Sequence, residues 1–260
     1  MCYKHQFYGI ASHRCVQMTP TLRCNQRCLF CWRSFEHEVT AEEECPPEVI
    51  LENIHRLQKK ALAGYNAVLD NTVTDTTWKE ALDPRHVAIS LSGEPTLYTR
   101  LSELIDLFNA NSYTTFLVSN GTNPDVLSRC RAYQTYVSLD APDEEIYRKV
   151  CRPLSDTWEM VFESLCLLGS RRSVVRITLV AGLNDVTPER YAAILQDSGA
   201  QFIEVKGYMY LGYSRNRLQR KNMPAHEAVR AFAEKIAAAC DYSVRDENRL
   251  SRVVCLERER

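Results

Sequence analysis

The chain has 260 residues, and its 45% hydrophobic and 25% charged residues are typical of a folded globular protein rather than a disordered or fibrous one. The 32 basic and 33 acidic residues nearly cancel, so any attraction to nucleic acid must come from a local basic surface. No apolar run approaches the roughly 20 residues that cross a bilayer, and the start lacks the layout of a secretory signal, so we expect a cytoplasmic protein without a membrane partner.

From about residue 86, short β-branched runs alternate with longer helical patterns, which indicates repeated βα units. Strands are predicted at 15–22, 86–91, 114–119, 135–140, 174–180 and 202–207. Helices are predicted at 47–63, 77–82, 101–109, 123–131, 157–168 and 188–197. Because the strands are apolar on both faces, we expect a parallel sheet covered by helices, and an α/β fold in the form of a partial (β/α)6 TIM-like barrel over residues 15–209.

The rest of the chain, residues 210–260, is predicted to form a C-terminal extension. It contains a helix at 224–239, where apolar residues recur at spacings of three and four. Residues 242–257 have the pattern of a β-hairpin. Because no low-complexity linker interrupts the chain, we expect a single domain over residues 1–260.

Three cysteines, Cys24, Cys28 and Cys31, follow the predicted first strand within one short loop. A structural zinc site is one interpretation, with His37 or Cys45 as a fourth ligand, although zinc usually takes its ligands as two pairs from separate segments. Three thiolates can instead hold an iron–sulfur cluster and leave one iron open for an outside ligand, as a catalytic cluster needs. Reactive groups of βα barrels lie at the C-terminal ends of the strands, and the position of this loop favours the catalytic cluster.

Polar groups also follow the later strands. Gly93 and Glu94 come after the second strand, where a glycine lets the backbone approach a ligand and an acid can meet an ammonium group. Asn120, Asp140 and Asn184 follow the third, fourth and fifth strands. Each of them alone is ordinary turn chemistry, but together they predict a binding site at this edge of the sheet.

The cysteine spacing, with Phe30 just before the last cysteine, resembles the motif of the radical S-adenosylmethionine (SAM) superfamily. Ser92-Gly-Glu-Pro95 is similar to the superfamily's motif for the amino group of SAM. The resemblance implies a radical SAM barrel in which the three cysteines hold a 4Fe-4S cluster. The residues then expected around SAM and its cluster are Phe30, Gly93, Glu94, Asn120, Asp140 and Asn184.

A more specific resemblance, to the archaeal 4-demethylwyosine synthase family, extends over nearly the whole chain. The segments that carry it are Cys2-Tyr-Lys4, Phe7-Tyr-Gly-Ile10, His13-Arg-Cys15-Val-Gln-Met-Thr-Pro20, Cys28-Leu-Phe-Cys31-Trp-Arg33, Leu91-Ser-Gly-Glu-Pro-Thr96, Ser138-Leu-Asp-Ala141, Cys151-Arg-Pro153 and Val205-Lys-Gly-Tyr-Met209. Members of this family join two carbons of pyruvate to N1-methylguanosine at position 37, next to the anticodon of tRNA(Phe), and form tricyclic 4-demethylwyosine. The resemblance therefore implies a radical SAM carbon–carbon lyase that acts on tRNA.

Family members carry a second, auxiliary 4Fe-4S cluster, and its ligands matched by position here are Cys2 and Cys15. Residues 1–14 would then be the auxiliary-cluster segment. A further family cysteine lies upstream of the first residue of this sequence, so we expect either a start downstream of the natural one or a second cluster with one ligand missing. The alternative for Cys2 is a terminal thiol without a ligand role.

The resemblance also implies a lysine that condenses with the ketone of pyruvate. Burial or a nearby cation lowers the pKa of a lysine enough to make its amine a nucleophile. Lys4 matches the family lysine by position, and Lys206 on the sixth strand is the second candidate. Their structural alternatives are a solvated terminal lysine and a salt bridge to Glu204, respectively.

A tRNA substrate needs cations for its phosphates and aromatic surfaces for an unstacked base. We expect these contacts from the stretch 208–221, through Tyr213, Arg215, Arg217, Arg220 and Lys221, although a solvated basic loop fits the stretch equally well. No flavodoxin-like segment is present, so we expect an external electron donor. The alternative functions are another radical SAM enzyme, such as a glycyl-radical activase, or a non-catalytic iron–sulfur or zinc RNA-binding adaptor.

Overall fold

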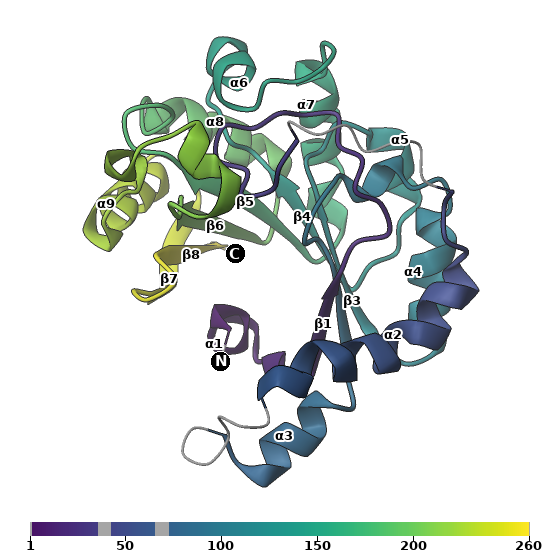
Figure 1. The fold of residues 1–260 in the computed structure, drawn as a ribbon. Helices are drawn as coiled ribbons and strands as arrows, with labels where there is room; N and C mark the ends of the chain where they lie inside the picture. Colours follow the sequence, from purple (N-terminus) through teal and green to yellow (C-terminus); the bar gives the residue numbers. More distant parts are fainter. Residues whose placement is uncertain (1, 36–42, 66–72, 260) are drawn as a thin grey trace.

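The computed structural model describes residues 2–35, 43–65 and 73–259, in which eight strands form one sheet in the order β1-β2-β3-β4-β5-β6-β8-β7. The first six strands are parallel and neighbour one another in chain order, which confirms the predicted βα succession. They are β1 (Cys15–Met18), β2 (His86–Ile89), β3 (Thr114–Ser119), β4 (Gln134–Ser138), β5 (Ser173–Leu179) and β6 (Phe202–Gly207). Figure 1 shows this sheet as a curved, open structure with helices on its outer side.

The first two strands end earlier than the sequence predicts. β1 stops at Met18 instead of residue 22, since Pro20 has no N–H to donate to a strand ladder. β2 stops at Ile89, and shortly after it Leu91 has a φ of 23°, outside the extended region. As a result, the segments 19–35 and 90–94 are free to turn over the C-terminal edge of the sheet.

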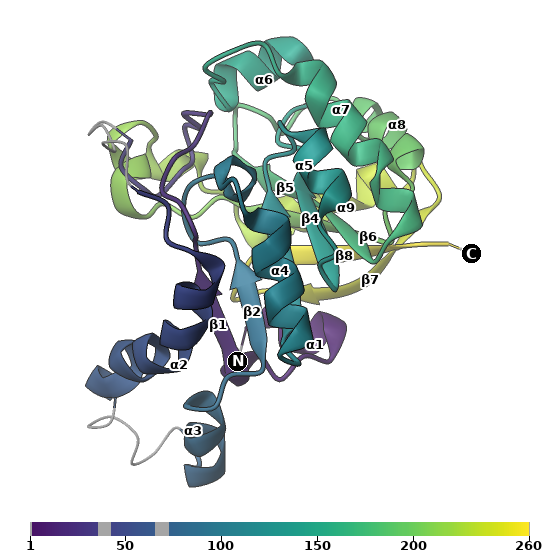
Figure 2. The same ribbon diagram turned by 90° about the vertical axis from the view of Figure 1, so that its right-hand side faces the viewer.

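Helices cover the outer face of the sheet (Figure 2). The helices after α1 (Tyr3–Tyr8) are α2 (Pro47–Leu62), α3 (Asp75–Ala81), α4 (Leu101–Ala110), α5 (Pro124–Arg129), α6 (Glu144–Val150), α7 (Trp158–Cys166), α8 (Pro188–Ser198) and α9 (His226–Ala237), of which α3 lies below the sheet in Figure 2 and does not cover it. Of these helices, only α6 was not predicted from the sequence. Short 3-10 helices lie at Ser12–Arg14, Pro95–Leu97, Leu168–Ser170, Gly212–Asn216 and Arg220–Asn222. None of the helices in the described parts of the chain is long and apolar enough to span a membrane.

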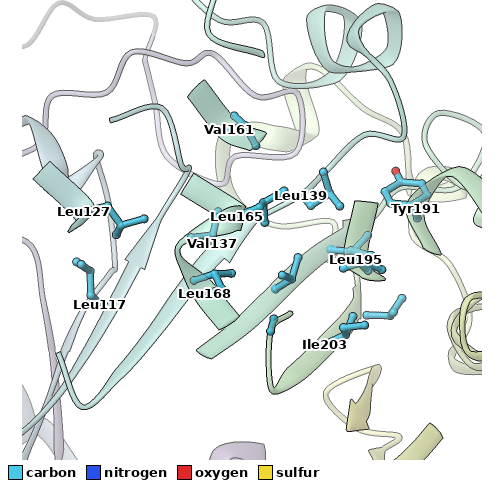
Figure 3. Close-up of a cluster of buried hydrophobic side chains, with 14 of the residues drawn as sticks. Leu117, Leu127, Val137, Leu139, Val161, Leu165, Leu168, Tyr191, Leu195 and Ile203 are labelled. Carbon is cyan, nitrogen blue, oxygen red and sulfur yellow. The ribbon is translucent and has the colours of Figure 1, made fainter. Parts of the chain in front are cut away.

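The main core lies between the sheet and these helices. In Figure 3, Leu117 of β3 lies near Leu127 of α5 and Val137 of β4 lies near Leu165 of α7, while Leu195 of α8 lies farther along the sheet. All five belong to one cluster of buried side chains, and none is more than 2% exposed. This packing fixes the strands and so the positions of the loops that follow them.

The predicted C-terminal hairpin is confirmed, and it also extends the sheet. β7 (Tyr242–Asn248) and β8 (Val253–Arg258) are antiparallel to each other, and β8 pairs antiparallel with β6. β1 and β7 therefore form the two edges of the sheet. Because these edges are not joined, the structure is a partial barrel, as expected.

A short N-terminal helix, α1 (Tyr3–Tyr8), was not predicted. Tyr3 and Phe7 pack on the inner face of the sheet, in a cluster with side chains of β2 to β6 and β8. The side chain of Gln6 donates a hydrogen bond to Asp246 of β7 at 2.8 Å. α1 therefore forms the floor of the half-barrel, at the end opposite the C-terminal edge of the parallel strands (Figure 1).

Candidate active site

A cavity of about 1090 Å³ opens at the C-terminal edge of the parallel strands. Its lining includes all three cysteines of the predicted cluster loop. Six other sequence-predicted site residues also line it, namely Phe30, Gly93, Glu94, Asn120, Asp140 and Lys206. The rim residues that the sequence placed at separate strand ends are thus brought together around one space.

The backbone of the cysteine loop contacts the turn after β2 closely. The amide of Glu94 donates to the carbonyl of Arg23 at 2.7 Å. Gly93 has a φ of 72°, and a Cβ there would lie 2.3 Å from the carbonyl oxygen of Thr21. Only glycine permits this approach, which explains the glycine of the Ser92-Gly-Glu-Pro95 motif in steric terms.

The segment after α6 holds the other side of the cysteine loop. Arg27 and Leu29 donate their backbone N–H groups to the carbonyls of Cys151 and Val150, at 3.1 and 2.9 Å. The thiol of Cys151 is buried against Cys28, and the hydrogen bond between the two raises the pKa of the Cys28 thiol. The Cys151-Arg-Pro153 motif therefore positions the cluster loop.

Arg217 closes the loop from a third side. Its guanidinium donates to the carbonyl oxygens of Leu29 at 3.3 Å, of Cys31, and of Arg33 at 3.3 Å. It also stacks on the ring of Phe35, with 4.1 Å to the centroid. Arg217 was expected to contact RNA, and the structure shows that its guanidinium donors hold the cysteine loop, so an RNA contact of Arg217 stays a prediction.

The three thiols are partly buried and neutral in the absence of metal. Burial raises the pKa of Cys24 to about 12, and it also raises the pKa of Cys31. Nearby charges act in both directions, since Glu94 raises the pKa of Cys24 whereas Arg217 lowers that of Cys31. Binding of a metal must therefore displace protons from these thiols.

The donor set fits an iron–sulfur cluster better than one zinc ion. Within residues 2–35, 43–65 and 73–259, no three Cys, His, Asp or Glu side chains are arranged to hold a single metal ion. A zinc ion needs its ligands in one tight tetrahedron, whereas each cysteine of a cuboidal cluster binds a different iron. Of the two candidate fourth zinc ligands, Cys45 is exposed and His37 lies outside the described residues.

Glu94 and Asn120 form a buried network between the strand ends. Glu94 accepts hydrogen bonds from Ser119 Oγ at 2.7 Å, from Thr96 Oγ1 at 2.8 Å and from the backbone N–H of Asn120 at 2.7 Å. Burial raises the pKa of Glu94, and these hydrogen bonds oppose that shift. The side chain of Asn120 reaches Asn25 of the cysteine loop, at 2.9 Å. The network ties the loop to β2 and β3.

Asp140 and Asn184 have different positions although both were expected to bind a cofactor. Asp140 lines the cavity, accepts from the N–H of Thr178 at 2.6 Å, and has its pKa raised to about 6 by burial. Asn184 is fully buried behind it and does not line the cavity. Its amide donates to the carbonyls of Asp140 and Thr178, both at 2.9 Å, so Asn184 holds Asp140 in place from behind the cavity lining.

The two candidate lysines lie near a buried ion pair. Arg176 of β5 and Glu204 of β6 are joined at 2.8 Å. Lys4 Nζ lies 4.3 Å from the ring centroid of Tyr136, and Lys206 Nζ lies 5.1 Å from that of Tyr3. Burial is the main cause that lowers the pKa of both lysines, and the nearby charge of Arg176 lowers it further. Of the two, only Lys206 lines the cavity.

Cys2 and Cys15 flank Lys4 at the floor of the half-barrel, where both thiols influence the pKa of its amine. Cys2 is exposed, whereas Cys15 is partly buried against the inner cluster. Burial raises the pKa of Cys15 to about 11, and the charge of Lys4 opposes this. The structure thus brings together the three N-terminal residues that the sequence analysis selected.

The remaining predicted RNA-contacting residues lie on the surface beside the cysteine loop. Tyr213, Arg215, Arg220 and Lys221 are exposed, and the backbone N–H of Tyr213 donates to the carbonyl of Trp32 at 2.9 Å. Their segment therefore continues the mouth of the cavity.

Among the cavity-lining residues that were missed in the sequence are Gln17, Arg176 and Trp32. A polar or charged residue inside an apolar strand was the available signal for Gln17 and Arg176. For Trp32 no signal separated an exposed aromatic from a buried one.

Comparison with known proteins agrees with this geometry. A model described as the radical SAM superfamily matches residues 18–195, and one described as wyosine base formation matches residues 197–258. The tRNA 4-demethylwyosine synthase of Methanocaldococcus jannaschii is 40% identical over 99% of this chain and 85% of its own length. The corresponding protein of Pyrococcus abyssi is 43% identical over 99% of this chain and 79% of its own length.

A solved structure of TYW1 with a lysine-pyruvate adduct bound superimposes with a TM-score of 0.90, at 40% identity, over 99% of this chain and 84% of that one. Sequence, fold and site therefore place this chain in the family of radical SAM tRNA 4-demethylwyosine synthases.

Proposed function

We propose that this enzyme uses pyruvate and acts on N1-methylguanosine at position 37 of tRNA(Phe), forming tricyclic 4-demethylwyosine. The observation that carries the proposal is the single cavity that contains the three cysteines, the Gly93–Glu94 turn and the partly buried Lys206. A glycyl-radical activase or a non-catalytic adaptor would have no use for a lysine of lowered pKa in that cavity.

Cys24, Cys28 and Cys31 would hold the SAM-binding 4Fe-4S cluster. When bound, such a cluster offers an open iron to SAM and supplies the electron for its radical chemistry. We assign Phe30, Gly93, Glu94, Asn120 and Asp140 to the surroundings of SAM, with Asn184 holding Asp140 in place. The buried walls of the cavity keep water away from the reacting methyl group.

The pyruvate-binding residue is one of the two lysines near the Arg176–Glu204 ion pair. Its neutral amine attacks the ketone carbon of pyruvate, a C–N bond forms, and water leaves to give an imine. Lys4 is the first candidate, because it is held against aromatic rings between Cys2 and Cys15, and Lys206 is the second, because it lines the cavity. The lysine-pyruvate adduct described for TYW1 supports this step.

Cys2 and Cys15 are the proposed ligands of an auxiliary 4Fe-4S cluster next to Lys4. Their position at the floor of the half-barrel supports a role near the pyruvate site. We further propose that residues 1–260 act as one domain in the cytoplasm and receive electrons from an external donor. RNA phosphates would meet Arg215, Arg220 and Lys221, with Tyr213 beside them.

Product formation tests the function. The protein is reconstituted anaerobically with iron and sulfide, reduced with dithionite, and incubated with SAM, pyruvate and N1-methylated tRNA(Phe). Digestion of the RNA should then yield a tricyclic base, and unmethylated tRNA is the matched control. SAM cleavage without a tricyclic base would contradict the proposed substrates, and no SAM cleavage would favour the adaptor.

Borohydride trapping identifies the lysine. Wild-type protein incubated with labelled pyruvate should retain the label after reduction, and Lys4→Ala should lose it. Loss in Lys206→Ala alone would transfer the assignment to Lys206. Retained label in both single variants would contradict both assignments.

A further inference from the structure

The mouth of the cavity carries an exposed tryptophan that the chemistry described above does not use. Trp32 is 45% exposed and lines the cavity, one residue after Cys31. Leu211 and Tyr213, which lie next to it, are 56% and 44% exposed. Large apolar side chains gathered at the rim of a cavity indicate a binding surface rather than a part of the core.

Trp32 is held rigidly, although it is exposed. Its carbonyl accepts the backbone N–H of Tyr213 at 2.9 Å, and a Cβ on Gly212 would lie 2.3 Å from the same carbonyl oxygen. Arg217 binds the carbonyls on both sides of it, those of Cys31 and Arg33. An exposed aromatic ring on a fixed backbone loses little conformational freedom when a ligand stacks on it.

The cation that lies over the Trp32 ring favours binding of RNA. The guanidinium of Arg33 lies 4.3 Å from the Trp32 ring centroid, and its buried Nε has no hydrogen-bond partner among the described residues. An arginine over an aromatic ring offers both a cation for phosphate and a planar surface for a base. The exposed cation Arg215 lies in the same segment as Tyr213.

We propose that Trp32, with Arg33 stacked on it, is the platform on which a nucleobase next to the reacting guanine stacks. The inference rests on the proposed function, in which the reacting base enters the cavity. A base that leaves its stack exposes the faces of its two neighbours, and the neighbours then need a new stacking partner. Trp32 lies at the cavity mouth, where such a neighbour arrives.

Binding of an anticodon stem-loop RNA to the reconstituted enzyme tests the platform. The probe carries a fluorophore and N1-methylguanosine at position 37, and Kd is measured by anisotropy. Stacking of one base on an aromatic side chain contributes about 1–3 kcal/mol, so Trp32→Ala should raise Kd about 5- to 150-fold. Trp32→Phe should restore most of the affinity. Tyr65→Ala, which truncates an aromatic residue that is 61% exposed on another surface, should leave Kd unchanged.

A second set of RNA probes separates a loss of stacking from a general loss of binding. Probes that lack the base at position 36 or at position 38 remove one neighbour each. With the probe that lacks the base stacked on Trp32, the affinity of the wild type should fall to that of Trp32→Ala for the intact probe. The affinity of Trp32→Ala should not fall further with this probe. Equal losses from Trp32→Ala with every probe, or unchanged Kd with the intact probe, would overturn the platform.

Two more readouts distinguish the platform from other roles. Iron content and SAM cleavage without RNA should be the same in Trp32→Ala and wild type. If SAM cleavage falls while RNA affinity is kept, Trp32 serves SAM or the cluster loop, and the proposal is wrong. If wild type binds the probe with the Trp32 dependence but forms no tricyclic base, the platform stands and the proposed function fails.

Discussion

The substitution Glu204→Gln tests whether a buried charge network holds the floor of the cavity. Glu204 is fully buried and accepts hydrogen bonds from Tyr3 at 3.0 Å, Tyr8 at 2.7 Å and Arg176 at 2.8 and 3.1 Å. Burial by itself raises the pKa of this carboxyl, but the charges of Arg176 and Lys4 and the hydrogen bonds from Tyr8 and Arg176 lower it below its ordinary value. Glu204 is therefore an anion in the folded protein at neutral pH.

Glutamine keeps the shape of the side chain and removes its charge, so Arg176 and Lys4 would be left buried without a counter-charge. Removal of one partner of a buried ion pair costs about 3–5 kcal/mol of unfolding free energy, and we expect this loss at neutral pH. A carboxyl whose pKa is lower in the folded than in the unfolded state stabilises the fold at pH values above the unfolded-state pKa. This stabilisation is lost as the pH falls through the folded-state pKa. The difference between wild type and variant should therefore shrink below about pH 4.5.

Urea unfolding of the cluster-free protein, followed by circular dichroism, measures this loss. The control is Arg176→Met/Glu204→Leu, in which both charges of the pair are replaced by apolar groups. This double variant should recover part of the stability that Glu204→Gln loses, because Arg176 is no longer left as an unpaired buried charge, whereas Lys4 still lacks its counter-charge. A loss under about 1 kcal/mol in Glu204→Gln, or the same loss at neutral pH and below pH 4, would refute the reasoning.

Three further predictions concern the cluster loop and Asp140. Gly93→Ala should lower stability and reduce the iron bound after reconstitution, because the new Cβ would lie 2.3 Å from the carbonyl of Thr21. Asn184→Ala should cost about 2–4 kcal/mol in urea unfolding, since it leaves the buried carbonyl of Asp140 and the partly buried carbonyl of Thr178 without their donor. Asp140→Asn should stabilise the metal-free and SAM-free protein near pH 8 by about 3 kcal/mol, because burial raises the pKa of Asp140 from 3.8 to about 6 and its ionised form is unfavourable in the fold. The stability that Asp140 contributes to the wild type is fully present below pH 3.8 and is lost as the pH rises through about 6, so the gain of the variant should vanish near pH 3.8.

Each of these predictions has a matched comparison. Gly182 has a φ of 75° with no atom within 4 Å of a built Cβ, so Gly182→Ala should show backbone strain alone and keep its iron. Equal iron loss in both glycine variants would contradict the steric explanation. Asn184→Asp should fail to rescue Asn184→Ala, since a carboxylate donates no hydrogen bond. A pH-independent gain in Asp140→Asn would show that ionisation of Asp140 is not the cause.

Much of this protein was readable in its sequence because the informative patterns are local. The βα period predicts the six parallel strands and nearly every helix around them. The cysteine loop and the Gly93–Glu94 turn each carry their chemistry within a few adjacent residues, and both line the cavity. Residue type, spacing and strand ends suffice for such features, since parallel strands bring their C-terminal ends to one edge.

Other features were decided only by the tertiary structure. The sequence shows that Arg217 is a cation, but it does not show where the side chain points. In the folded chain the guanidinium points toward the cysteine loop and donates hydrogen bonds to it. The amphipathic helix α1 is too short to show a period, and it forms because the half-barrel offers Tyr3 and Phe7 an apolar inner face. Arg176 of β5, Glu204 and Lys206 of β6, and Lys4 of α1 come from three separate segments. Their proximity depends on the path of the whole chain, so no local pattern encodes it.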